Sequence, residues 1–368
     1  MTSPVYFMDL RATVQENFFK KLDRLMKTAG VAKVIDKRDL VAVKLHFGEL
    51  GNMAYVRPVV LRQVVATVKA SGGEPFLTDA NTLYVGTRST TPSHLTTAIS
   101  NGFDYVVVGA PLVIADGLRG RSERAVKLGM KRIDQAYIGS EIAASDAIVS
   151  VAHVKGHELS GFGGTIKNMG MGCASRRGKL AQHSGISPAV TEEKCITCGE
   201  CKSHCSQSAI LMGDAMAIID ESICIGCGEC IVVCPSGAIN IRWSHLIPEF
   251  MEKMVEYTTA VIKDKDNKCF YLNFITNVSP GCDCWSSNDA PIVRDIGVLA
   301  SLDPVAIDQA AVDLINREQA LPGCCLTVNT QPGQDKFKGL YPDVNWSHQL
   351  VYAQKLGLGS REYELVRI

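Results

Sequence analysis

The sequence CITCGECKSHC occupies residues 195–205, and CIGCGECIVVCP follows at residues 224–235. Each run spaces three cysteines two residues apart and places a fourth three residues later. With this spacing, three thiolates hold one cubane iron-sulfur cluster and the fourth cysteine crosses to the other cluster. The spacing therefore predicts two [4Fe-4S] clusters. The crossed ligand sets are Cys195, Cys198, Cys201 and Cys234 for cluster I, and Cys205, Cys224, Cys227 and Cys230 for cluster II.

Structural zinc and disulfides are the alternatives for these cysteines. Zinc sites generally use pairs of ligands that lie far apart in sequence, and disulfides are rare in the reducing cytosol. The two runs also repeat each other, because both contain Cys-Ile-x-Cys-Gly-Glu-Cys and both are followed by Ala-Ile. This internal repeat indicates a duplicated half-ferredoxin, whose function is the transfer of single electrons.

The composition is that of a globular protein. Apolar residues make up 46% of the chain and charged residues 21%, and 38 basic side chains balance 38 acidic ones. This balance gives no electrostatic reason to expect nucleic acid as a partner. The sequence shows neither an export signal nor a long uncharged apolar run, so we expect a cytoplasmic protein without a membrane partner.

Strands and helices alternate on both sides of the cysteine runs, which predicts an α/β fold with a mostly parallel, doubly wound sheet. We expect an inserted ferredoxin-like α+β domain at 190–242, between a first α/β part at 1–189 and a second at 243–368. The expected strands are 41–46, 76–79, 105–108, 147–152, 269–275 and 296–300. The expected helices are 13–30, 58–70, 93–100, 138–144, 248–262 and one from Pro304, and 322–346 is expected to be loop.

A second group of polar residues precedes the cysteine runs. His153 ends a predicted strand, His157 follows, and Lys167 comes after a glycine-rich stretch. Ligands of open α/β sheets bind at the carboxyl ends of the strands, where His46 and Asp79 are also expected. We therefore interpret His153, His157 and Lys167 as candidate catalytic residues. The candidate ligand-binding residues, for an anionic small molecule, are Gly163, Gly164, Lys167 and Asn168.

Four further residues form a candidate third metal site. Cys282 and Cys284 follow the predicted strand at 269–275, and Cys173 follows the glycine-rich stretch. If both strands belong to one parallel sheet, these thiols meet at its carboxyl edge, with His183 as a nitrogen ligand. An additional metal, a redox pair of thiols and inert thiols remain open.

The chain resembles the domain of unknown function family 362, in the version with an inserted ferredoxin unit. The resemblance rests on VKLHFG at 43–48, on His153 and His157 with the stretch from Gly163 to Cys173, on Cys282-Asp-Cys284, and on DPVAID at 303–308. It covers most of the chain and implies an α/β iron-sulfur protein.

The sequence thus favours an iron-sulfur electron-transfer protein, with a redox protein as partner, that relays electrons to a polar ligand or metal in the α/β domain. The alternatives are a carrier that docks a larger reductase and has no substrate of its own, and a cluster-based sensor or maturation factor.

Overall fold

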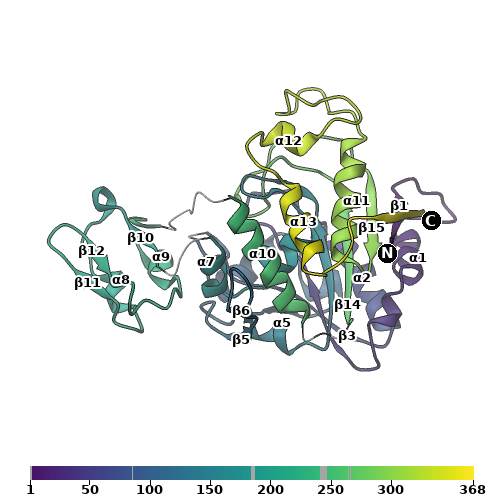
Figure 1. Cartoon of the computed structure of the whole chain (residues 1–368). Coiled ribbons are helices and arrows are strands. Elements are labelled where there is room, and N and C mark those ends of the chain that lie inside the picture. Colours follow the sequence, from purple (N-terminus) through teal and green to yellow (C-terminus); the bar gives the residue numbers. More distant parts are fainter. Residues whose placement is uncertain (1, 85, 184–186, 241–246, 264, 266) are drawn as a thin grey trace.

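The computed structural model describes residues 2–84, 86–183, 187–240, 247–263, 265 and 267–368 (Figure 1). The boundary expected between residues 242 and 243 lies outside the described residues, as do residues 241 and 242 of the predicted insert. The chain forms one large sheet covered by helices. A smaller cysteine-rich unit, residues 189–240, stands to the left of this sheet in Figure 1.

The large sheet is mostly parallel, as the alternation of strands and helices predicts. Its strands in the described part of the chain are β1 (Ser3–Asp9), β2 (Leu40–Lys44), β3 (Glu74–Asp79), β4 (Leu112–Ile114), β7 (Ala147–His153), β14 (Cys269–Ile275), β15 (Gly297–Ser301) and β16 (Tyr363–Arg367). Their order across the sheet is β16-β1-β15-β14-β7-β2-β3-β4. Among these strands only β15 runs antiparallel to its neighbours, β1 and β14.

The centre of the sheet joins segments from both sides of the cysteine-rich unit. Strand β14 lies parallel to β7, with Phe274 paired to His153. Both strands are buried along their whole length, as expected for parallel strands covered on both faces. Residues before and after the cysteine-rich unit therefore build a single sheet.

Helices cover both faces of the sheet. Because successive strand side chains point to opposite faces, Val41 and Val43 join one buried cluster, whereas Ala42 joins the other. The first cluster includes residues of α1 and α2, and the second includes residues of α6, α10, α11 and α13. The longer helices are α1 (Phe18–Thr28), α2 (Pro58–Ala70), α3 (Thr91–Ser100), α7 (Arg176–His183), α10 (Ile247–Ile262), α11 (Pro304–Asn316) and α13 (Ser347–Lys355). The shorter ones are α4 (Tyr105–Val108), α5 (Ser140–Ala144), α6 (Thr165–Gly170), α12 (Lys336–Leu340) and two 3-10 turns, Val31–Lys33 and Glu192–Lys194.

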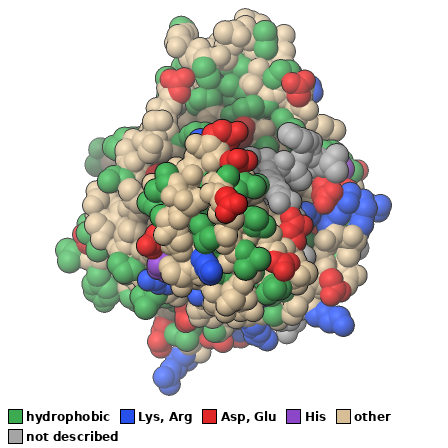
Figure 2. All heavy atoms as spheres, turned by 90° about the vertical axis from the view of Figure 1, so that its left-hand side faces the viewer, with side chains coloured by type: hydrophobic (Ala, Val, Ile, Leu, Met, Phe, Trp, Pro, Cys, Tyr) green, Lys and Arg blue, Asp and Glu red, His purple; other side chains and the backbone are tan. Residues whose placement is uncertain are grey.

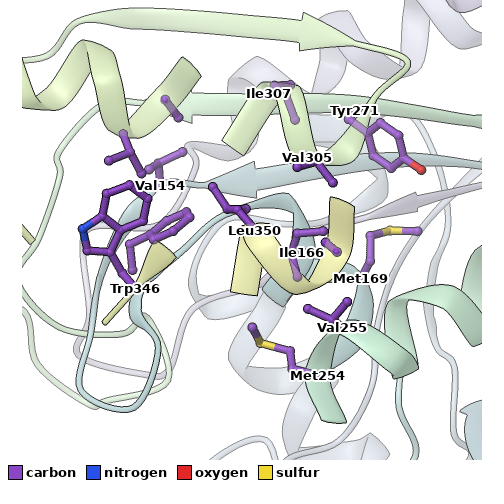
Figure 3. Packing of buried hydrophobic residues seen from close by; sticks show 14 of the residues in the cluster. Val154, Ile166, Met169, Met254, Val255, Tyr271, Val305, Ile307, Trp346 and Leu350 are labelled. Carbon is purple, nitrogen blue, oxygen red and sulfur yellow. The ribbon is translucent and has the colours of Figure 1, made fainter. Parts of the chain in front are cut away.

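The second cluster fixes helix α6 beneath the site described below. Figure 3 shows Ile166 and Met169 of α6 packed among Met254, Val255 and Leu350, which come from α10 and α13. Each of these side chains is fully buried, and burial of one such side chain stabilises the fold by roughly 1.5 to 3 kcal/mol.

Some expected elements differ from the observed ones. The expected strand at 105–108 is wrong: the segment forms the single-turn helix α4, and the strand comes later, at 112–114. Asp104 accepts a hydrogen bond from the Val107 amide, and Gly109 (φ 77°) ends the turn, so the two caps override the strand preference of three valines. Helix α1 begins at Phe18 because Asn17 caps it, five residues after the expected start.

Two further expectations are corrected. Residues 138 and 139 of the expected helix at 138–144 belong to strand β6 (Gln135–Gly139), which pairs with β5 (Glu123–Lys127), and only α5 is helical. The expected loop at 322–346 contains α12, capped by the side chain of Asp335. A further hairpin, β8 (Lys155–His157) with β9 (Gly161–Gly163), follows β7 directly.

The cysteine-rich unit contains two similar halves. Its elements are β10 (Ala189–Val190), α8 (Glu200–Ser203), β11 (Ile210–Met212), β12 (Ala217–Ile219), α9 (Glu229–Val233) and β13 (Ile239–Asn240). Strand β10 pairs with β13, and β11 pairs with β12, both antiparallel. Gly199 and Gly228 precede the two helices with φ of 80° and 69°, a backbone conformation that favours glycine.

Candidate functional site

A polar cavity lies at the carboxyl ends of β2, β3 and β7, where the sequence places its ligand site. Lys44, Asp79 and His153, the last residues of these strands, all line it. The cavity has a volume of about 100 Å³. The other charged side chains along its wall are Arg88, Lys155, Glu158, Lys167 and Lys179. Basic side chains thus outnumber acidic ones, which suits an anionic ligand.

Buried ion pairs hold the floor of this cavity. Lys44 Nζ lies 3.0 Å from Asp79 Oδ1, and Arg88 Nε lies 2.9 Å from Glu49 Oε2. Burial acts to raise the pKa of Asp79, but Lys44 and the neighbouring cations outweigh it and lower that pKa. Among the described residues, the Nη2 atom of Arg88 has no hydrogen-bond partner. This buried donor can bind an acceptor atom of a ligand.

Lys179 is a buried lysine in the cavity wall whose pKa is lowered. Its ammonium donates a 2.6 Å hydrogen bond to the Ala174 carbonyl, and the side chain is buried. Burial lowers the pKa of Lys179 to about 8, despite the nearby carboxylates of Asp116 and Asp79. Its charge therefore depends on pH near neutrality.

The loop Cys282-Asp283-Cys284 forms one wall, and Asp283 anchors it. The Asp283 carboxylate lies 2.9 Å from His153 Nδ1 and accepts a 2.8 Å hydrogen bond from Lys155 Nζ. The other ring nitrogen of His153 lies 2.9 Å from the Thr276 carbonyl. Both nitrogens of His153 are thus engaged by protein oxygens. His153, a candidate catalytic residue from sequence, instead positions the cysteine loop.

Lys167 and His157 face the cavity as predicted. Lys167 Nζ lies 3.0 Å from Cys282 Sγ. The Nδ1 atom of His157 accepts a hydrogen bond from the Ser160 amide, so its Nε2 carries the hydrogen. Burial lowers the pKa of His157 well below its ordinary value, and burial likewise lowers that of His183, which stacks on Phe250, to about 3. His157 and His183 are therefore neutral.

Close packing requires a glycine at position 164 of the glycine-rich stretch, which the sequence alone did not reveal. A Cβ on Gly164 would lie 2.3 Å from Asp308 Oδ1. That carboxylate accepts hydrogen bonds from the amides of Thr165 (2.7 Å) and Ile166 (2.9 Å), the first residues of α6. The amides of Thr165 and Ile166 are thus occupied by Asp308. Gly163 and Gly164 still line the cavity.

Asn168 lies at the cavity wall but is held by the ends of two strands. Its amide group donates to the Lys44 carbonyl at 3.1 Å and to Ser150 Oγ at 2.8 Å, and its carbonyl accepts from Lys44 Nζ at 3.0 Å. The side chain therefore orients Lys44, and its own polar atoms are already paired.

The residues of the candidate third metal site do not all meet. Cys282, Cys284 and His183 line the cavity, whereas Cys173 lies behind its wall in the apolar core, where burial raises the pKa of its thiol to about 11. Among the described residues, no three His, Cys, Asp or Glu side chains have the spacing of ligands around a single metal ion. The loop after β14 lies at the cavity, as the topology predicts. Cys173 was expected at the same edge of the sheet but lies in the apolar core.

The eight cysteines of the two runs surround two small cavities in the cysteine-rich unit. One is lined by Cys195, Cys198, Cys201 and Cys234, and the other by Cys205, Cys224, Cys227 and Cys230. We call them the outer cage and the inner cage, because Cys198 is exposed, whereas the loop beside Cys227 contacts the α/β domain. Each cage combines three cysteines of one run with the last cysteine of the other.

Sequence reasoning missed Arg88, Asp283, Lys44 and Tyr84, which all contribute to the site. Lys44 did carry a signal, since a lysine at the end of a strand that is otherwise apolar needs a buried partner. Asp283 stands between the two cysteines of the loop and carried a similar signal. Arg88 and Tyr84 lie in a connection after β3 whose sequence shows no motif.

No helix in the described part of the chain combines the length and apolar character needed to cross a membrane. A search of curated proteins found no match. Among solved structures, the fold is similar to the lactate racemase apoprotein from Thermoanaerobacterium thermosaccharolyticum, with a TM-score of 0.43, 13% identity, and coverage of 88% of this chain and 60% of that one. A protein from Thermotoga maritima gives a TM-score of 0.39 and 10% identity, with 73% of this chain and 52% of that chain covered. This chain thus spans little more than half the length of either protein.

The family comparison agrees with the motifs quoted from the sequence. The family model described as a domain of unknown function, DUF362, matches residues 41–313. The match begins in β2, includes the whole cysteine-rich unit and the cavity loop Cys282–Cys284, and ends in α11. The chain is a member of the DUF362 family.

Proposed function

We propose that this protein is an iron-sulfur electron-transfer protein that carries two [4Fe-4S] clusters and passes electrons to a ligand in the polar cavity. The observation that carries the proposal is the pair of cysteine cages. Each is lined by four thiols, and each takes its fourth thiol from the other run. This is the ligand pattern of a two-cluster ferredoxin-like unit.

The donor atoms fit such clusters. The cages offer thiols, and thiolates are the soft ligands that iron-sulfur clusters use. The amides of Ala209 and Ala238 donate to Cys205 Sγ (3.3 Å) and Cys234 Sγ (3.2 Å), so backbone N–H groups already point at one sulfur of each cage. A cubane is larger than a single ion, so its ligands stand farther apart than those of zinc. When bound, such clusters accept and release single electrons.

The protein's own residues hold the inner cage against the α/β domain. Glu229, next to Cys230, is buried, and its carboxylate lies 2.8 Å from Arg176 and 2.8 Å from Arg119. Both arginines belong to the α/β domain, so these ion pairs hold the inner cage against it. A carrier that only docks to another reductase needs no such fixed link to an α/β domain with a polar cavity.

The outer cage faces the side on which a redox partner would bind. Figure 2 looks at this side of the molecule, where apolar and acidic side chains are interspersed. Ile196, beside Cys195, is 62% exposed. Residues 189–240 contain seven Asp and Glu side chains against two Lys. This surface suits a partner protein with a basic face around an apolar centre.

The test is to purify the protein without oxygen and to measure iron, sulfide and zinc together with the absorbance and electron paramagnetic resonance spectra. We expect about eight irons and eight sulfides per chain. A stoichiometric amount of zinc in place of iron would refute the proposal. If the cages contain iron but no ligand binds in the cavity while a partner protein turns over, the carrier alternative is favoured.

A further inference from the structure

Two cysteines outside the cages meet in the polar cavity. Cys282 and Cys284 lie on one tight turn, in which the Trp285 amide donates to the Cys282 carbonyl at 3.1 Å. Within the turn, the Cys284 amide donates to Cys282 Sγ at 3.4 Å. The side chain between them, Asp283, is held by two buried partners, as described above. The turn therefore presents both sulfur atoms to one cavity.

The two thiols are in different chemical states. A hydrogen bond from Cys284, together with the nearby Lys167 ammonium, holds the pKa of Cys282 well below its ordinary value. The same hydrogen bond raises the pKa of Cys284 well above its ordinary value, and burial adds to this effect. The pair therefore favours a thiolate at Cys282, beside the Lys167 ammonium at 3.0 Å, and a thiol at Cys284. One nucleophilic sulfur and one protonated sulfur are what thiol–disulfide chemistry requires.

Tyr84 connects this pair to the inner cage. Its hydroxyl is hydrogen-bonded to Cys284, and burial raises its pKa well above the ordinary value, so the hydroxyl keeps its proton. The preceding residue, Leu83, packs in the apolar cluster of the cysteine-rich unit. A Cβ on Gly228 would lie 2.9 Å from Leu83 Cδ1, so this glycine, next to Cys227, touches Leu83 directly. A short path of contacts thus leads from Cys227 to Cys284.

We propose that Cys282 and Cys284 interconvert between a dithiol and a disulfide, and that Leu83 and Tyr84 link this couple to the inner cage. The source of electrons rests on the function proposed above, whereas the couple itself does not. The Sγ–Sγ bond breaks when it takes up two electrons, which two bound [4Fe-4S] clusters would supply, one each. Cys282 then becomes the thiolate, and Cys284 takes up one proton from solvent, while the Tyr84 hydroxyl keeps its own proton and donates a hydrogen bond to the Cys284 sulfur. Oxidation of the dithiol returns two electrons and one proton.

This assignment gives the two clusters a shared purpose, because a disulfide requires two electrons and each cluster carries one. It also explains why the cavity contains Lys167 beside a sulfur atom. The ammonium stabilises the thiolate in the reduced state and has no such partner in the disulfide state. Reduction therefore places a new negative charge next to Lys167, at the point where an anionic ligand would otherwise bind.

The first experiment measures the couple directly. The full-length protein is equilibrated with mixtures of reduced and oxidised dithiothreitol, acid-quenched and alkylated, and the tryptic peptide 269–294, which contains Cys269, Cys282 and Cys284, is analysed by mass spectrometry. We expect a single two-electron transition in which this peptide loses two alkylation sites. The Cys282→Ser and Cys284→Ser variants should lose the transition, and the control Cys325→Ser, an exposed cysteine elsewhere, should retain it.

Thiols that stay fully reduced at the oxidising end of the titration would overturn the proposal. So would one equivalent of zinc whose binding requires both cysteines, because the pair would then be a metal site. This experiment measures the dithiol–disulfide equilibrium of Cys282 and Cys284 whether or not iron is present. Its failure is therefore distinct from a failure to find clusters.

The second experiment tests the link to the inner cage. Anaerobic protein with the disulfide formed receives electrons from a photoreduced one-electron donor, and the cluster absorbance and the alkylation of Cys282 and Cys284 are followed together. We expect Tyr84→Phe to slow the appearance of the two thiols by roughly tenfold or more, because the Cys284 sulfur loses the hydrogen bond that stabilises it as the disulfide breaks. Cluster reduction should proceed as in the parent protein. Equal rates of thiol formation in both proteins would refute the role of Tyr84.

Discussion

Lys167 shows how a single charge sets the chemistry of the cavity. Its ammonium contacts Cys282 Sγ at 3.0 Å, and an opposite charge at that distance favours the ionised form of a thiol. The Lys167→Met variant should therefore raise the pKa of Cys282. We expect its alkylation by iodoacetamide at pH 7 to become about tenfold slower or more, as read by mass spectrometry of peptide 269–294. Lys202→Met, an exposed lysine, is the control, and an unchanged pH profile would show that the hydrogen bond from Cys284 alone activates Cys282.

Lys179 gives a pH dependence with a definite sign. Burial lowers the pKa of this lysine to about 8 from an ordinary 10.5, so the unfolded chain holds one more proton than the folded chain between these values. Unfolding in that window takes up a proton, and the free energy of unfolding therefore rises with pH from about 8 to 10.5. Urea denaturation of the parent and of Lys179→Met should show that the variant lacks this rise.

Proton titration of Lys179 can also be followed on its own. Reductive methylation with ¹³C-formaldehyde gives each lysine an NMR signal, and the signal missing in Lys179→Met identifies the residue. We expect its midpoint near pH 8, whereas exposed lysines titrate near 10.4. A midpoint above pH 10 would mean that the ammonium has a stronger partner than the Ala174 carbonyl.

At this scale the sequence predicted the residue types but not their tasks. His157, Lys167 and Cys282 were expected at the cavity because their strands were recognisable, and they lie there. His153 was expected to act on a ligand, yet its ring nitrogens face Asp283 and the Thr276 carbonyl. Such pairing across more than a hundred residues depends on how two loops meet, which no local pattern encodes.

The two cysteine runs depend on each other, because each cage takes one ligand from the other run. Cys205→Ala should therefore damage the inner cluster, and Cys234→Ala the outer one, although each cysteine belongs to the opposite run. Electron paramagnetic resonance of the reduced variants, with iron analysis, should show one altered cluster in each. The reverse assignment would refute the crossed ligand sets.

Helix α6 depends on a carboxylate from another helix. Asp308, in α11, accepts hydrogen bonds from two amides at the start of α6 and one from Asn273. Asp308→Ala should lower the free energy of unfolding by about 2 to 3 kcal/mol, because three buried donors lose their acceptor. Urea denaturation beside Asp343→Ala, an exposed carboxylate, would measure this loss, and equal stability of the two variants would contradict the capping role.

Elements with clear periodicity or caps were predicted well, such as α2, which begins at Pro58 and ends before the glycine pair at 72–73. The segment at 105–108 was not, because three valines favour a strand and only the caps at Asp104 and Gly109 favour a turn of helix. The antiparallel direction of β15 was also missed. The direction of a strand depends on the connection that leads to it, and the loop between β14 and β15 contains no sequence pattern from which we could predict that direction.

In the whole molecule, the cysteine-rich unit is anchored through one half of its repeat. Glu229 is buried against Arg176 and Arg119, whereas Glu200, its counterpart in the first half, is exposed. Glu229→Gln should loosen the unit, since loss of one partner of a buried ion pair costs about 3 to 5 kcal/mol. We expect faster limited proteolysis and faster amide exchange around residues 224–235.

Glu200→Gln is the matched control for this substitution, because it changes the same residue type in the same motif without touching the α/β domain. Its proteolysis should equal that of the parent protein. If both variants behave alike, the ion pairs do not anchor the unit, and the contacts of Leu83 must do so. The sequence predicted the insert from its motif but could not predict this anchor, since Arg119 and Arg176 belong to no motif.

The strand order also dictates when the protein can fold during synthesis. Strand β7 leaves the ribosome long before β14, its partner in the sheet, and the cysteine-rich unit is translated between them. Until β14 arrives, β7 is an open edge with mostly apolar side chains, and β1 waits even longer for β15 and β16. The nascent N-terminal half is therefore exposed to edge-to-edge association. The unit between the halves, whose strand pairings all lie within residues 189–240, has the first opportunity to acquire its native structure.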